Sequence, residues 1–88
     1  MAWTVSFEPR ALGEIKKLDR VTQQRVVRFL RARIAGGHDP RGFGKPLTGE
    51  KVGLWRYRVG NYRIVCRIDD EGQAVLVLRI AHRKDVYR

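Results

Sequence analysis

The segment LWRYRVGNYRIVCR, residues 54–67, limits the possible folds more than any other part of this 88-residue chain. Apolar and polar residues alternate on both sides of Gly60–Asn61, a pair that forms tight β-turns because both residues tolerate positive φ. The segment is therefore predicted to be a β-hairpin with its turn at these residues. A turn of this length fixes the register, so Arg58 is expected to lie directly opposite Arg63.

This register has a consequence for charge, because paired residues of a hairpin project to the same face and successive residues alternate between faces. One face gathers the arginines of the segment, which are Arg56, Arg58, Arg63 and Arg67. The other face is the expected core side, and it carries Trp55, Tyr57, Val59, Tyr62, Ile64, Cys66 and Ile68. Like charges opposite each other destabilise a sheet by up to about 1 kcal/mol. Two interpretations stay open: a solvated face whose charges are screened by salt, or a phosphate-binding surface.

The remaining sequence predicts an α+β domain. AWTVSF reads as a short strand, and EPRALGEIKKLD as a helix with Pro9 in its first turn. A second helix is expected over RVTQQRVVRFLRARIAGG, capped by Asp19 and ended by its glycines. Residues 38–53 are predicted to be a long loop with a functional or partner-binding role. The segment QAVLVLRIA is expected to be a buried central strand.

These elements predict one domain, residues 1–88, in the order β-α-α-β-β-β. The helices would form an N-terminal hairpin packed on a small antiparallel β-sheet.

Charge is the strongest compositional signal. Nineteen Lys and Arg residues against nine Asp and Glu give a net charge of +10 and a pI near 10.9. Such a balance favours a polyanionic partner, which is a nucleic acid, an acidic protein or an anionic membrane, over a basic domain without one. The single Cys66 excludes an internal disulfide and fits a reducing cytoplasm. The N-terminal residues contain no long apolar run, so no signal peptide is expected, and no segment reaches the apolar length expected of a membrane span.

The tail AHRKDVYR adds groups that carry protons, which are His82, Lys84 and Tyr87, together with Arg83. No cluster with metal-ligand spacing and no cofactor motif is present, so an enzyme of this composition is expected to act on a phosphodiester without metal. The feasible reaction is attack of an RNA 2′-hydroxyl on the adjacent phosphate. Arginines would stabilise the developing negative charge, and the tail groups would transfer protons.

The segments GFGKPLTGEKVGLWRYRVGNYRIVCRI and VLRIAHRKDVYR, with VSFEPRALGEIKKLD near the N-terminus, resemble the RelE branch of the RelE/ParE toxin superfamily. The resemblance covers nearly the whole chain and implies the same fold of a helical hairpin on a small sheet. It further implies a cytoplasmic toxin of a type II toxin–antitoxin pair that cleaves mRNA in the ribosomal A site without a metal or cofactor. The implied partner is a cognate antitoxin, expected to be acidic and to wrap the toxin.

The resemblance also implies roles for individual residues. Arg56, Arg63 and Arg83 would contact the phosphate and the transition state, and Tyr87 would transfer a proton or stack on a base. Lys84 and His82 would support them, and the expected RNA-binding residues are Arg58, Arg67 and Lys45.

The chain also departs from the family pattern. Arginines stand where some relatives have lysines, Leu54 replaces one such lysine, and Ala81 replaces a frequent glycine. Because arginine is a poor base, proton transfer would shift to His82, Lys84 or Tyr87.

Two other functions fit the same sequence. A ParE-like toxin would inhibit DNA gyrase without cleaving RNA, since a shared fold does not fix function. A plain RNA-binding module would lose affinity evenly as arginines are removed, and Tyr87→Phe would change little.

Overall fold

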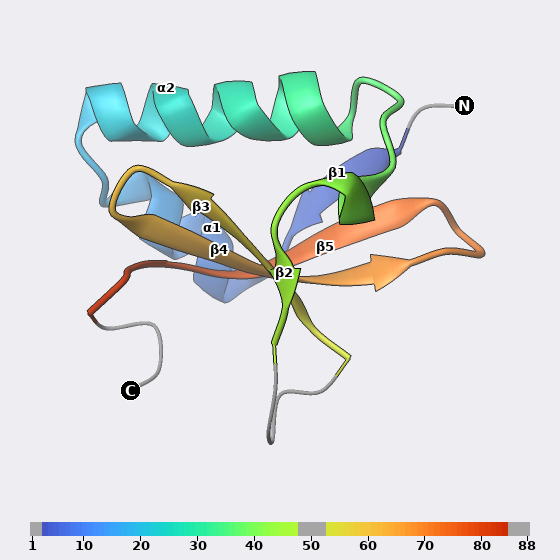
Figure 1. Cartoon of the computed structure of the whole chain (residues 1–88). Helices are drawn as coiled ribbons and strands as arrows, with labels where there is room; N and C mark the ends of the chain where they lie inside the picture. The colour runs from blue at the N-terminus through green and yellow to red at the C-terminus, as the bar shows by residue number, and fades with distance from the viewer. Residues whose placement is uncertain (1–2, 48–52, 85–88) are drawn as a thin grey trace.

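The computed structural model describes residues 3–47 and 53–84 (Figure 1). Its strands and helices are β1 (Thr4–Phe7), α1 (Pro9–Lys16), α2 (Arg20–Phe29), β2 (Lys45–Pro46), β3 (Trp55–Val59), β4 (Tyr62–Asp69) and β5 (Ala74–His82). A π-helical turn over Leu30–Ile34 continues α2, and a 3-10 turn covers Pro40–Gly42. This content confirms the predicted α+β class.

Within the described residues the strands form one sheet in the order β1-β5-β4-β3-β2. The pairs β2–β3, β3–β4 and β4–β5 are antiparallel, and β5 lies inside the sheet as predicted. The prediction of a wholly antiparallel sheet is wrong in one place, because β1 runs parallel to β5. The strands β3 and β4 intervene in sequence between these partners, so their pairing depends on contacts that no local pattern encodes.

The helices begin where the sequence predicts. Pro9 occupies the first turn of α1, where its missing N–H costs nothing. The Asp19 carboxylate caps α2 by accepting a hydrogen bond from the Thr22 N–H at 3.1 Å. Its bond with the Thr22 hydroxyl, at 2.6 Å, and then the backbone bond lower the pKa of the Asp19 carboxyl. The helix ends before Gly37, whose φ of 96° breaks the helical path.

The core lies between the helices and one face of the sheet, and α2 crosses over that face (Figure 1). The buried residues of this cluster are Ala11, Ile15, Val26, Leu30, Ile34, Tyr57, Ile64, Cys66, Val75, Val77 and Ile80. The hairpin residues Tyr57, Ile64 and Cys66 belong to the face that alternation assigns to the core. Burial raises the pKa of the Cys66 thiol to about 12, and burial also raises the pKa of Tyr57.

The predicted long loop is partly structured and is tied to the core face of β3. Tyr57 donates its hydroxyl to the Pro40 carbonyl at 2.7 Å, and Trp55 donates its indole N–H to the Phe43 carbonyl at 2.6 Å. Arg41 forms a two-bond ion pair with Asp70, at 2.6 and 3.0 Å, which lowers the pKa of that carboxyl. The two hydrogen bonds to β3 hold the segment that precedes β2, a strand that the sequence interpretation had placed in the loop.

Gly44 allows the chain to enter β2. Its φ is +72°, and a Cβ at this position would collide with the Arg56 carbonyl oxygen. Among the residues that the structure describes, no helix is long and apolar enough to span a membrane.

Candidate nucleic-acid interface

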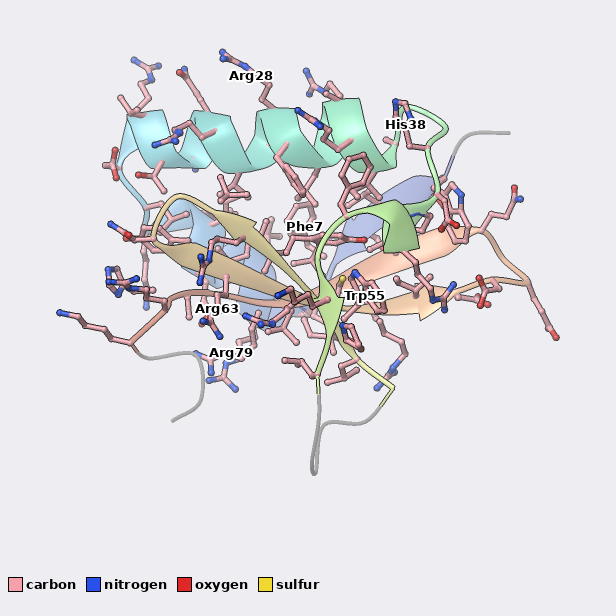
Figure 2. The ribbon with its side chains drawn as sticks, viewed as in Figure 1. Phe7, Arg28, His38, Trp55, Arg63 and Arg79 are labelled. Atoms are coloured by element: carbon pink, nitrogen blue, oxygen red, sulfur yellow. The ribbon has the colours of Figure 1, made fainter. Side chains whose placement is uncertain are left out.

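The hairpin register agrees with the prediction. Arg58 lies opposite Arg63 and Arg56 opposite Val65, on either side of the turn at Gly60, whose φ is +59°. Because the intervening residues point into the core, these arginines point to the sheet face away from α2. We call this surface the arginine face and define it by Arg56, Arg58, Arg63 and Arg67. In Figure 2, Arg63 lies on this side of the sheet and Arg28 on the far outer surface of α2.

Lys45 joins the edge of this surface through β2, where it pairs directly with Arg56. Beside this pair is a hollow of about 260 Å³, lined by Gly44, Lys45, Arg56, Tyr57 and Arg58. Cationic side chains on both sides of a hollow of this size suit an anionic group such as a phosphate.

The end of β5 borders the same surface. Ala81 pairs with Arg63, and the Arg83 N–H donates to the Asn61 carbonyl at 2.8 Å, which extends the ladder by one step. Alternation along the strand therefore assigns Arg83 to the side of Ala81, next to the arginines. The small Ala81 side chain leaves room between them.

His82 does not join the arginines. It pairs with Tyr62 on the helix side of the sheet, and the two rings meet edge to face with centroids 5.5 Å apart. Its Nδ1 accepts a hydrogen bond from the Lys84 N–H at 3.3 Å, so His82 supports the turn that carries Lys84. Tyr87 lies outside the described residues.

One cation of this surface was missed by sequence reasoning. Unbroken alternation from Val75 and Val77 would have placed Arg79 in the core, but a bulge in β5 pairs it with Val65 on the arginine face. The signal was present, because an arginine at a nominal core position indicates an irregular strand.

The arginine face also has an apolar floor. Leu47, Val65 and Ala81 are buried there as a second cluster, with Leu54 packed against them. These apolar residues, two of which pair with arginines across the sheet, offer contacts to a base or sugar beside contacts to phosphate. Among the described residues, no group of His, Cys, Asp and Glu is arranged to hold a metal ion.

A sequence model described as "ParE toxin of type II toxin-antitoxin system, parDE" matches residues 5–87 of this chain. The chain belongs to this toxin family.

Two relatives come from Mycobacterium tuberculosis. The chain is 39% identical to toxin RelG over 88 residues, covering 100% of this chain and 99% of that protein. It is 41% identical to toxin RelE over 84 residues, covering 96% of this chain and 84% of that protein. The chain is thus a RelE-like toxin of the type II toxin–antitoxin class, as the sequence resemblance indicated.

The same fold occurs in solved structures of toxin–antitoxin complexes. The RelBE2 complex of M. tuberculosis matches with a TM-score of 0.81 at 38% identity, covering 97% of this chain and 95% of that one. The archaeal RelE–RelB complex of Pyrococcus horikoshii matches with a TM-score of 0.73 at 21% identity, covering 98% of this chain and 100% of that one. The latter identity supports the fold alone.

Proposed function

We propose that this toxin is a ribosome-dependent mRNA endoribonuclease that works without a metal or cofactor. The observation that carries the proposal is the arginine face, where Arg58 and Arg63 stand directly opposite each other on a rigid sheet. Like charges directly opposite each other are expected to oppose folding, and an anionic ligand would offset that repulsion. RNA is favoured as that ligand by the resemblance of the sequence to the RelE branch, and the similarity to toxins RelG and RelE agrees with that branch.

In the proposed reaction, the 2′-oxygen of the nucleotide bonds to the neighbouring phosphorus while the bond from phosphorus to the 5′-oxygen breaks. The products are a 2′,3′-cyclic phosphate and a 5′-hydroxyl. Arg56, Arg63 and Arg83 bind the phosphate and stabilise its growing negative charge, a contribution that is often the largest in such reactions. DNA lacks the 2′-hydroxyl and cannot react in this way.

Proton transfer is assigned to the tail. Tyr87 and Lys84 are tail groups that can both release and accept a proton. One of them takes the 2′-proton and the other protonates the departing 5′-oxygen. His82 acts indirectly, because its Nδ1 holds the backbone of Lys84. Arg58, Arg67 and Lys45 bind flanking phosphates.

Expression of the toxin in a bacterial host, followed by mapping of new mRNA 5′ ends, tests this function. Wild type is compared with Arg83→Ala and Tyr87→Phe at matched protein levels, and Arg28→Ala removes a charge from the opposite side of the molecule as control. We expect cuts at fixed codon positions of translated messages with wild type and the control, and none with the other variants. Growth arrest with intact messages and a DNA-damage response would instead identify gyrase as the target.

The proposed partner is an acidic antitoxin. Between α1 and α2 lies a groove of about 610 Å³ with apolar residues Phe7, Leu12, Ile15 and Val27 and basic residues Lys16, Arg28 and Arg31. This combination suits an amphipathic acidic segment, and several structures with the same fold are complexes with RelB antitoxins.

The partner is tested with the product of the neighbouring reading frame. Leu12, which is 43% exposed, is changed to Asp, and co-purification with that product is expected to fail. The control Val21→Asp alters an apolar side chain that is 65% exposed and does not line the groove, so it is expected to retain the partner.

A further inference from the structure

The bulge in β5 changes which residues reach the arginine face. Val65 pairs with Arg79 and Cys66 pairs with Val77, so Leu78 is an extra residue on the β5 side of the ladder. As a result Val77 and Ile80 both point into the core, and Arg79 and Ala81 both point away from it. Bulges of this kind often re-aim a side chain beside a functional site.

Arg79 is held there by a carboxylate from another element. Glu14 of α1 accepts the Ile80 N–H at 2.8 Å with Oε1 and the Arg79 Nη2–H at 3.2 Å with Oε2. The pairing of β1 with β5 ends at Val77, so Glu14 takes the acceptor position that a neighbouring strand would otherwise fill. The Arg79 and Glu14 side chains are only 18% and 22% exposed, which limits screening of their interaction by solvent.

The register places Arg79 among the proposed phosphate contacts. Val65 separates it from Arg56 in one row across the sheet, and it is a diagonal neighbour of Arg63, which pairs with Ala81. Diagonal positions of this type are about 7–8 Å apart, within reach of one phosphodiester group. In Figure 2, Arg63 and Arg79 lie on the same side of the sheet, away from α2.

We infer that Arg79 is a further RNA-phosphate contact of this toxin and that Glu14 is the residue that positions it. This inference rests on the proposed function. An arginine already fixed by a carboxylate loses little side-chain entropy when it binds a ligand, which favours affinity. The carboxylate also offsets part of the repulsion among the cations of the arginine face before the RNA arrives.

The alternative role for this pair is structural, anchoring α1 to the open edge of β5. Substitution of Arg79 by Gln separates the two roles, because Gln still donates a hydrogen bond to Glu14 but has no charge. The matched control is Arg41→Gln, which removes the same charge from the exposed ion pair with Asp70. Arg79→Lys retains the charge and serves as the rescue.

Binding is measured over a range of salt concentrations with ribosomes carrying an mRNA whose A-site codon is 2′-O-methylated, so that it binds without cleavage. We expect Arg79→Gln to bind roughly tenfold more weakly than wild type. The salt slope is the slope of the logarithm of the binding constant against the logarithm of the salt concentration. For Arg79→Gln its magnitude should fall by about 0.7 to 1, the amount for one phosphate contact, while Arg79→Lys and Arg41→Gln keep the wild-type slope. Equal slopes for Arg79→Gln and Arg41→Gln would overturn the inference.

Glu14→Gln gives a second test, because a positioning role and a purely structural role of Glu14 predict opposite changes in RNA affinity. Removing a negative charge beside an RNA site would strengthen binding if Glu14 were only structural. If Glu14 positions Arg79, Gln has one oxygen in place of the two that accept the Ile80 N–H and the Arg79 Nη2–H, and its NH2 group would face one of these donors. RNA binding then weakens and the salt slope falls. Thermal unfolding of each variant confirms that it folds. Wild type that fails to bind these ribosomes would overturn the proposed function itself, whereas normal wild-type binding with tighter binding by Glu14→Gln would overturn only this inference.

Discussion

The two faces of the β3–β4 hairpin are built from alternate residues of the same strands, yet they serve different purposes. The helix-side face carries Tyr57 and Ile64, which are 1% and 0% exposed, and it makes the core. The arginine face carries Arg58 opposite Arg63. Apolar burial on the first face stabilises the fold, whereas the paired arginines on the second are expected to oppose it through charge repulsion. The comparison teaches that of two adjacent residues in one strand, one can contribute to stability and the other to function.

The largest effect is expected on the core side. Ile64→Ala should destabilise the toxin by about 2–5 kcal/mol, because it leaves a cavity in a fully buried position. Urea unfolding measures this loss, with Arg63→Ala, the neighbouring residue on the opposite face, as control. Similar losses of stability for Ile64→Ala and Arg63→Ala would contradict the assignment of stability to the helix-side face.

The buried thiol gives a pH-dependent effect on the same side. The pKa of Cys66 is raised from 9.0 to about 12 by burial, so the unfolded chain ionises first. Its contribution to stability is therefore full below about pH 9 and is lost between about pH 9 and pH 12, at up to about 1.4 kcal/mol per pH unit. The difference in unfolding free energy between wild type and Cys66→Ala should shrink over that range. A constant difference would show that the thiol is accessible to solvent.

A smaller effect is expected where the core face supports the arginine face. Tyr57→Phe removes the hydrogen bond to the Pro40 carbonyl, which should cost about 1–2 kcal/mol of stability. Because this bond helps to fix the segment leading to Lys45, RNA binding should weaken as well. The unfolding free energy and the RNA affinity are measured on one sample of Tyr57→Phe, with Tyr62→Phe as control. The result shows whether the core face supports the arginine face. Loss of stability with unchanged RNA binding would show that Lys45 does not depend on this anchor.

The smallest effect has the opposite sign. Arg58→Thr relieves the repulsion with Arg63, so stability should rise by a few tenths of a kcal/mol, and the gain should diminish with added salt. Thermal unfolding at low and high salt measures it, and Arg28→Thr on α2 is the control. A loss of stability at low salt would mean that the arginines do not repel each other in the folded protein.

Much of this fold was predictable because its signals are local. Gly60–Asn61 fixes the hairpin register, Pro9 and Asp19 mark the helix starts, and alternation then assigns each arginine to a face. The parallel pairing of β1 with β5 was not predictable, because it depends on which distant edge remains available.

The positions of the site residues were predictable where the register of the β3–β4 hairpin sets them. The register brought Arg56, Arg58 and Arg63 together as expected. It did not bring His82 to them, because β4–β5 pairing fixes that residue opposite Tyr62. Arg79 escaped prediction because a bulge moves every subsequent residue of β5 to the other face, and bulges depend on the fit between strands.

The most direct test combines stability and cleavage in Arg63→Ala. The unfolding free energy is measured in urea, and cleavage of mRNA on ribosomes is measured with the same preparation. We expect stability equal to or slightly above that of wild type, and cleavage reduced by about 10²-fold or more. Retained cleavage with a large loss of stability would contradict the account, because it would assign Arg63 to the fold rather than to RNA.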